Sequence, residues 1–241
     1  MITANWQAPA NIATLSTTRA NGVSMAPFSS FNLALHVGDK EADVLANRNQ
    51  LARSLPATPV WLNQVHSADV VVVDKQFDHR QVCSADALYT RIANQPLAIM
   101  TADCLAILLC TKDGNEVAAI HGGWRGLAGG IIANTLTNFI APTKEIIAWF
   151  GPAIGAQQFE VGNDVKETFL ELAPAYGTAF TVQREDKYLA DIYALAKLQL
   201  ADHGVLDVSG GEYCTVSQPE LFFSYRRDGQ TGRMASLIWR K

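Results

Sequence analysis

The sequence predicts a single α+β domain over residues 1–241, in which mixed β-sheets are flanked by helices. Two observations support this prediction. The expected strands and helices do not alternate strictly along the chain, which disfavours a doubly wound parallel sheet. Lys112-Asp113-Gly114-Asn115 separates two apolar runs, and its Asp-Gly pair is typical of a tight β-hairpin turn. No linker, repeat or low-complexity segment divides the chain.

The remaining elements follow from hydrophobic periodicity and from β-branched runs. Four consecutive valines predict a strand over 70–73. Apolar residues recur at helical spacing from Leu127 to Phe139, which predicts a helix over 125–140. The other expected elements are a helix over 40–54, a strand over 86–89, an apolar segment over 97–110, an apolar run over 117–120, a strand over 146–150, helices near 162–173 and 187–203, and a final strand over 234–239.

The composition narrows the functional class. With 49% hydrophobic and 17% charged residues the chain resembles an ordinary soluble protein. A formal charge of −4 gives no electrostatic reason to expect nucleic acid or an anionic membrane as a partner. The N-terminus lacks a signal-peptide pattern, and the four cysteines show no CxxC spacing. We therefore expect free thiols and a cytoplasmic location.

Cys104 and His121 are the most informative residues for chemistry. Each lies where a buried apolar run meets small or polar residues. The predicted hairpin joins these two runs as antiparallel strands, so Cys104 and His121 should meet at one end of the sheet. A thiol beside an imidazole is either part of a metal site or a nucleophile with its base. For Asp103, proton transfer or orientation of its neighbours competes with a simple turn-forming role.

His66 follows an apolar run and two amide side chains, and it adds a third candidate ligand. Together, His66, Cys104 and His121 form a possible His2Cys set, although their spacing matches no local zinc-finger pattern. Three protein ligands with one open position would suit catalytic Zn²⁺. A hydrogen-bonded core histidine is an equally good interpretation of His66. We interpret His36 as structural, His79 as solvated and His203 as a helix-end residue.

Several motifs together resemble the bacterial YfiH-type laccase-domain family, and the resemblance spans almost the whole chain. The matching segments are Phe31-Asn32-Leu33, Val37-Gly38-Asp39, Gln64-Val65-His66, Ala85-Asp86-Ala87-Leu88, Thr101-Ala102-Asp103-Cys104, His121-Gly122-Gly123-Trp124-Arg125-Gly126, Gly151-Pro152-Ala153-Ile154-Gly155, Ser224-Tyr225-Arg226-Arg227-Asp228 and Thr231-Gly232-Arg233. One departure is that Ala156-Gln157-Gln158 stands where relatives often have a cysteine.

The resemblance implies a zinc-containing purine nucleoside enzyme. Such an enzyme phosphorolyses adenosine, inosine, guanosine and methylthioadenosine, and it also deaminates adenosine. The resemblance further implies His66, Cys104 and His121 as zinc ligands. The implied fold is similar to the catalytic domain of the cytotoxic necrotising factors. The expected partners are therefore purine nucleosides and inorganic phosphate.

Within that interpretation, four polar residues are candidates for substrate binding. Arg48 and Arg125 could contact phosphate, because guanidinium groups match its geometry. Arg125 also belongs to a Gly-rich helix start, where backbone N–H groups suit an anion. Asn32 and Gln64 could bond the sugar or the base.

Three other functions compete with the nucleoside enzyme. The first is a cysteine hydrolase or deamidase that uses a Cys104–His121 dyad. The second is a copper-dependent polyphenol oxidoreductase, as the older family label implies. Five histidines do not furnish both a blue copper site and a trinuclear cluster, so we reject a true laccase, although copper could replace zinc or bind adventitiously. The third is a non-catalytic partner protein, which no exposed apolar stripe supports.

Overall fold

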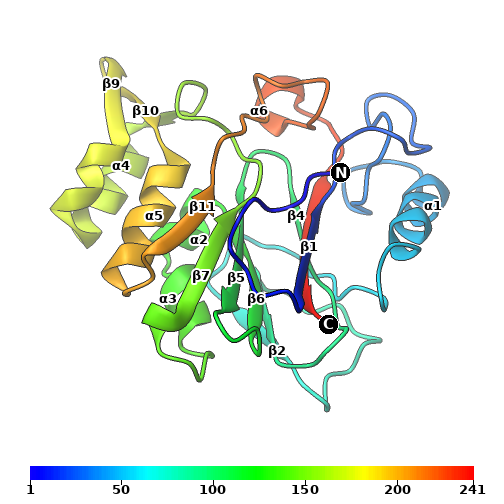
Figure 1. The fold of residues 1–241 in the computed structure, drawn as a ribbon. Helices are drawn as coiled ribbons and strands as arrows, with labels where there is room; N and C mark the ends of the chain where they lie inside the picture. Colours follow the sequence, from blue (N-terminus) through cyan, green and yellow to red (C-terminus); the bar gives the residue numbers. More distant parts are fainter.

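The chain folds into an α+β domain in which two β-sheets lie face to face between helices (Figure 1). The coordinates are a computed structural model that describes residues 1–241. The larger sheet has six strands, and its outer strands pair in parallel while the others are antiparallel. In spatial order the strands are β11 (Asp207–Gly210), β7 (Ile146–Phe150), β5 (Leu105–Thr111), β6 (Val117–Gly122), β3 (Ala87–Thr90) and β2 (Val70–Val73).

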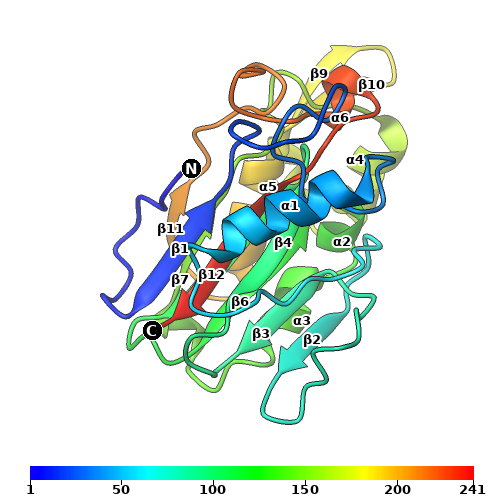
Figure 2. The same cartoon turned by 90° about the vertical axis from the view of Figure 1, so that its right-hand side faces the viewer.

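The second sheet is antiparallel and pairs the two ends of the chain. It runs in the order β1 (Ile12–Ser16), β12 (Met234–Arg240) and β4 (Leu97–Thr101). Helix α1 (Glu41–Ala52) crosses its outer face, as the turned view shows (Figure 2). The opposite side of the molecule carries α2 (Trp124–Ala128), α3 (Ile131–Leu136), α4 (Asn163–Leu172) and α5 (Ile192–Asp202) against the six-stranded sheet.

Three apolar cores separate these layers. The largest lies between the helices α2 to α5 and the six-stranded sheet, and it contains Ile107, Ile120 and Phe169. A second core lies between the two sheets, with residues such as Leu108 and Ile99, and a third lies under α1. Strands β5 and β6 are therefore buried on both faces, which explains why their sequences are continuous apolar runs rather than alternating ones.

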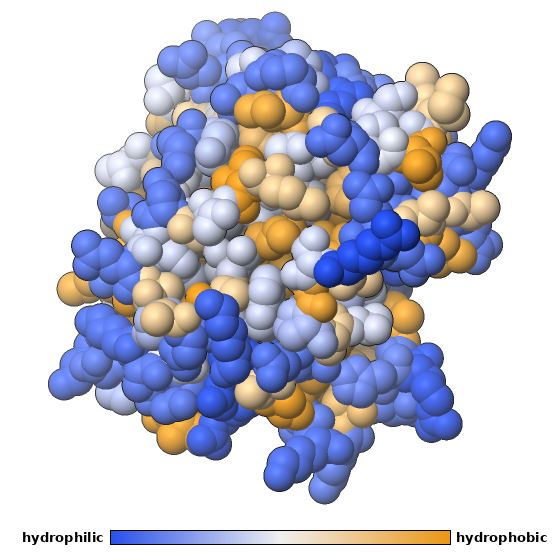
Figure 3. Space-filling view, turned by 45° about the vertical axis from the view of Figure 1, so that its right-hand side comes forward, coloured by the Kyte–Doolittle hydropathy of each residue, from blue (hydrophilic) through white to orange (hydrophobic).

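Smaller elements complete the fold. A three-stranded sheet of β8 (Glu160–Gly162), β10 (Lys187–Ala190) and β9 (Phe180–Arg184) projects beside α4, and α6 (Tyr225–Asp228) precedes β12. Two 3-10 helices span Thr143–Glu145 and Pro174–Ala179. On the face shown in Figure 3, hydrophilic side chains surround a central band of apolar and weakly polar ones. No helix is long and apolar enough to span a membrane.

The predicted α+β class with mixed sheets and the central hairpin are confirmed. Two predicted helices differ from the structure. The helix expected over 125–140 is two short helices, because Gly130 takes a left-handed φ of 87° between them. The helix expected over 187–203 begins only at Ile192. Asp191 caps it by accepting a hydrogen bond from the Ala194 N–H at 2.9 Å, and the preceding residues pair as β10.

Candidate metal centre and active site

The three candidate ligands come from three separate segments that converge at one end of the sheets. Cys104 is the last residue of the short turn between β4 and β5, and His121 lies near the end of β6. The β5–β6 register pairs Ala106 with His121, so the hairpin brings Cys104 and His121 together as predicted. His66 lies in the segment between α1 and β2 and has a left-handed φ of 62°.

The ligand atoms of His66, Cys104 and His121 all lie within 4.8 Å of one another. Cys104 Sγ is 3.7 Å from His66 Nε2. The two imidazole rings meet edge to face, with centroids 4.8 Å apart and an interplanar angle of 77°. The structure contains no other group of three or more histidine, cysteine or carboxylate side chains with this closeness.

Asp86 is hydrogen-bonded to two of these candidate ligands, His66 and His121. Its side chain is completely buried, and one carboxylate accepts hydrogen bonds from the backbone N–H groups of Val65, His66 and Ser67 at 2.7–3.1 Å. The same carboxylate accepts a hydrogen bond from His121 Nδ1 at 2.7 Å. Nε2 of His121 is therefore left as its free ring nitrogen. A carboxylate behind a histidine is the usual support of a metal-binding imidazole.

The residues of the cluster also shift one another's pKa values. Burial raises the pKa of the Cys104 thiol, but His121 and His66 outweigh that effect, and the net pKa is lower than that of an ordinary thiol. Burial lowers the pKa of His121, whereas Cys104 and Asp86 raise it, and the net pKa is higher than usual. The arrangement therefore favours a thiolate at Cys104, which is the form that binds metals and attacks electrophiles.

This donor set fits a metal ion. Two imidazoles and one thiolate suit zinc and copper, and three protein ligands leave a position for water or substrate. Gly123 gives the cluster its space, because a Cβ at this position would lie 2.8 Å from His66 Cδ2 and 3.3 Å from Cys104 Sγ. A His-Cys-His group that can hold a metal is therefore present.

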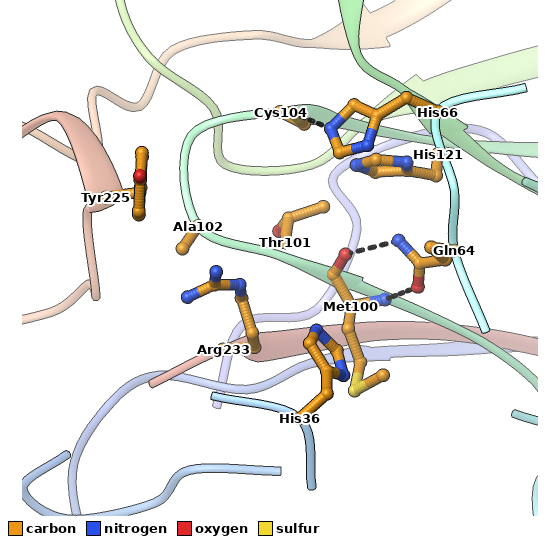
Figure 4. A pocket seen from close by; sticks show the side chains of 10 residues that line it. All are labelled: His36, Gln64, His66, Met100, Thr101, Ala102, Cys104, His121, Tyr225 and Arg233. Carbon is orange, nitrogen blue, oxygen red and sulfur yellow. Dashed lines mark hydrogen bonds between the residues drawn. The ribbon is translucent and has the colours of Figure 1, made fainter. Parts of the chain in front are cut away.

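The cluster opens into a cavity of about 250 Å³. In Figure 4 the two histidines and Cys104 lie on one side of it, and His36 and Arg233 lie on the other, with Thr101 between them. No carboxylate forms an ion pair with Arg233. Burial and the charges of Arg233 and Arg48 lower the pKa of His36, so its imidazole is neutral at pH 7.

The other predicted site residues lie at different distances from this cavity. Gln64 lines it, but its amide is hydrogen-bonded to the backbone N–H and C=O of Met100, both at 2.8 Å. Asn32 is fully buried outside the cavity and contacts Asp39 and the Arg233 backbone. It supports the chain around Arg233.

The two predicted phosphate-binding arginines do not line this cavity. Arg48 donates to the Leu33 carbonyl at 2.8 Å and stacks on Trp61, with its guanidinium 4.2 Å from the ring centre. Arg125 is exposed, stacks on Trp124 and lines a neighbouring cavity that reaches Cys104 from another side. Their roles in phosphate binding stay predictions.

Asp103 has a left-handed φ of 101° and lines the neighbouring cavity, and each of its carboxylate oxygens accepts one hydrogen bond. Oδ1 accepts a hydrogen bond from the Thr215 hydroxyl at 2.6 Å, and Oδ2 accepts one from the Arg226 N–H at 2.6 Å. Of the two interpretations of Asp103, these contacts favour orientation of the Cys104 turn over proton transfer.

Sequence reasoning did not place several residues in the site. His36, Tyr225 and Arg233 line the cavity, and Asp86 supports the ligands. Asp86, Tyr225 and Arg233 all belong to motifs that mark the family, and this membership was the only sequence feature that could have identified them as site residues. His36 follows the apolar triplet Leu33-Ala34-Leu35, which favoured the structural interpretation.

Several known proteins are similar to this chain in sequence over nearly its whole length. The family model described as "Multi-copper polyphenol oxidoreductase laccase" matches residues 13–241. A purine nucleoside phosphorylase of Haemophilus influenzae is 48% identical over 99% of this chain and 98% of its own. The Escherichia coli purine nucleoside phosphorylase YfiH is 46% identical over the same shares of the two chains.

Solved structures agree with these sequence matches. A Neisseria meningitidis protein of the DUF152 family has a TM-score of 0.94 and 47% identity, covering 100% of this chain and 98% of its own. YlmD from Geobacillus stearothermophilus has a TM-score of 0.89 and 34% identity, covering 96% of this chain and 93% of its own.

Proposed function

The chain belongs to the multi-copper polyphenol oxidoreductase laccase (YfiH-type) family, and on this basis we propose that it is a zinc-dependent purine nucleoside phosphorylase that also deaminates adenosine. The proposed substrates are adenosine, inosine, guanosine and methylthioadenosine, with inorganic phosphate. The single observation that carries the proposal is the His66–Cys104–His121 cluster, which shares one cavity with Arg233, an arginine in no ion pair. The names of the similar enzymes supply the substrate class.

His66, Cys104 and His121 would hold the zinc ion. When bound there, Zn²⁺ supplies a Lewis acid that can polarise a substrate atom or a water molecule. The chain contributes orientation, because Asp86 fixes the His121 ring and the backbone of His66 together. Copper is the alternative metal that the family description suggests, and the same three side chains would be its ligands.

Phosphorolysis requires groups that bind phosphate and ribose, and residues of the cavity can supply them. A phosphate oxygen forms a bond to C1′ of the ribose while the C1′–N9 bond breaks, and the purine leaves with the bonding electrons and takes up one proton. Arg233 offers a positive charge for the phosphate, and it forms no ion pair with a carboxylate. His36 is neutral there, so it can accept a hydrogen bond from a protonated phosphate oxygen or from a ribose hydroxyl.

Adenosine deamination would use the same cluster. The reaction replaces the amino group at C6 with oxygen from water and releases ammonia. Asp103 orients the Cys104 turn through Thr215 and Arg226, so another group must transfer the protons. Gln64 stabilises the cavity wall at Met100 rather than offering a free amide.

A cysteine hydrolase is the second candidate, and one observation favours it. Asp86, His121 and Cys104 lie in the order carboxylate, imidazole and thiol, and the pKa of the thiol is lowered. In this alternative His66 has no necessary role. A true multicopper oxidase is disfavoured, because His79 and His203 lie away from the cluster and leave too few imidazoles for several copper ions.

Product analysis beside metal analysis tests the proposal. Purified protein is incubated with adenosine or inosine, with and without phosphate, and the same sample is analysed for zinc and copper. We expect ribose 1-phosphate and a free purine base only when phosphate is present, together with about one zinc per chain. No turnover of any purine nucleoside would refute the proposal. Rapid alkylation of Cys104 in a metal-free, active protein would favour the hydrolase.

A further inference from the structure

A second cavity adjoins the metal cluster and differs from the first in chemistry. It has a volume of about 300 Å³, and most of its lining is apolar. Ile154, Phe159 and Ile192 are buried residues of its wall, and the half-buried Trp124 and the exposed Tyr225 also line it. Nothing in the reactions described above has used this space.

The two cavities are neighbours that share part of their lining, including the candidate ligand Cys104. Ala102, Cys104 and Tyr225 line both of them. Each cavity alone is at or below the size of about 300 Å³ at which ligand pockets begin, whereas the two together fall within that range. A single substrate that extends across Cys104 would therefore have one end in each cavity.

The chemistry of the two ends differs. The first cavity contains Arg233, whose positive charge is in no ion pair and suits an anion. The second offers the aromatic rings of Trp124, Phe159 and Tyr225, on which a planar heterocycle can stack. Displacement at C1′ requires the entering phosphate and the departing base to lie on opposite sides of that carbon.

We propose that the Trp124–Phe159–Tyr225 cavity is the purine subsite, and that phosphate binds at the Arg233 end. This inference rests on the proposed function. It assigns base affinity to Trp124, Phe159 and Tyr225, none of which sequence reasoning had named as a substrate contact. It also places Arg125 and Arg226 at the rim of the base subsite, where their guanidinium groups lie 4.4 and 5.6 Å from the centres of the Trp124 and Phe159 rings.

Steady-state kinetics of the zinc-loaded enzyme with Trp124→Leu test the assignment. Loss of a stacking ring should raise KM for inosine and the inhibition constant of free hypoxanthine by roughly 5- to 100-fold. KM for phosphate should change by less than about twofold, within the range of a surface substitution. Trp6→Leu is the matched control, because Trp6 is partly buried against the core between the two sheets and lines neither cavity.

Tyr225→Leu is a second test in case Trp124→Leu does not fold. Tyr225 is 62% exposed, so its replacement should leave folding intact. It should also weaken hypoxanthine inhibition, a measurement to which phosphate contacts contribute nothing. Unchanged inhibition by hypoxanthine in both variants, with wild-type phosphorolysis intact, would overturn the purine subsite and leave the proposed function standing. Weaker binding of 5′-methylthio nucleosides alone would instead place the 5′ end of the ribose there. Absence of wild-type phosphorolysis would reject the proposed function itself.

Discussion

Replacing Asp86 with asparagine should detach the metal ligands from their support. Asp86 receives four hydrogen-bond donors and no acceptor. His66 N and His121 Nδ1 reach Oδ1, whereas Val65 N and Ser67 N reach Oδ2. An asparagine has nearly the same shape, but it replaces one oxygen with an NH₂ donor. Whichever oxygen is replaced, two of the four donors lose their acceptor and face another donor.

The cost follows from these contacts. A hydrogen bond to a charged group contributes about 1.5–3 kcal/mol, so losing two should lower the free energy of unfolding by roughly 3–6 kcal/mol. The titration of Asp86 provides a separate estimate. Burial raises its pKa, but the hydrogen bonds from His121 and from the backbone outweigh this and lower the pKa to about 2 from an ordinary 3.8. That shift corresponds to about 2 kcal/mol. This stability is present above pH 3.8 and is lost as the pH falls towards 2.

The assay is urea unfolding of the metal-free protein, since metal binding would otherwise contribute to the measured stability. Zinc affinity is measured separately by chelator competition, and we expect a loss of about 10- to 100-fold. Asp74→Asn is the matched control, because Asp74 is exposed and should change stability by less than about 0.5 kcal/mol. An Asp86→Asn protein with the stability and zinc affinity of the wild type would show that this carboxylate does not organise the site.

Four further outcomes are expected. Cys104→Ala should lose most of the bound metal by elemental analysis, and full retention would exclude Cys104 as a ligand. His66→Ala should abolish phosphorolysis and deamination, whereas His79→Ala, outside the cavity, should retain both; an active, folded His66→Ala enzyme would leave the cysteine hydrolase as the better interpretation. Gly123→Ala should reduce metal affinity by at least about tenfold in chelator competition, because its Cβ would clash with His66, and unchanged affinity would show that the cluster adapts. Arg233→Gln should raise KM for phosphate by about 10- to 100-fold with a smaller effect on adenosine deamination, and equal losses in both reactions would place Arg233 at the common nucleoside site.

The parts of the fold that could be predicted are those with a strong local signal. The Asp-Gly turn and its two apolar runs identified the β5–β6 hairpin, and the hairpin alone brought Cys104 close to His121. The register of β1 with β12 had no comparable signal, because it joins residues from opposite ends of the chain. The break at Gly129-Gly130 within the helix expected over 125–140 was not predicted, because both short helices face the same core and the apolar spacing continues across the break.

The candidate site divides in a similar way. Residues with distinctive chemistry at the ends of strands were found, whereas His36, Tyr225 and Arg233 reach the cavity only through packing of distant segments. Arg48 and Arg125 carried the expected charge, but stacking on Trp61 and Trp124 determines where their guanidinium groups lie. Charge can be read from a sequence. The direction of a long side chain depends on neighbours that the sequence does not identify.

The backbone at the site shows why local rules failed there. His66 and Asp103 both adopt left-handed φ values, which cost about 1–3 kcal/mol each for residues with a Cβ. Each is held by contacts from elsewhere in the chain. Asp86 binds the His66 N–H, and Thr215 together with Arg226 binds the Asp103 carboxylate. One strained residue, His66, is itself a candidate ligand, and the other, Asp103, directly precedes the candidate ligand Cys104. The strain therefore lowers the stability of the fold while it brings the side chains of His66 and Cys104 together. Residues that break local preference while distant contacts hold them are therefore the ones that define this site.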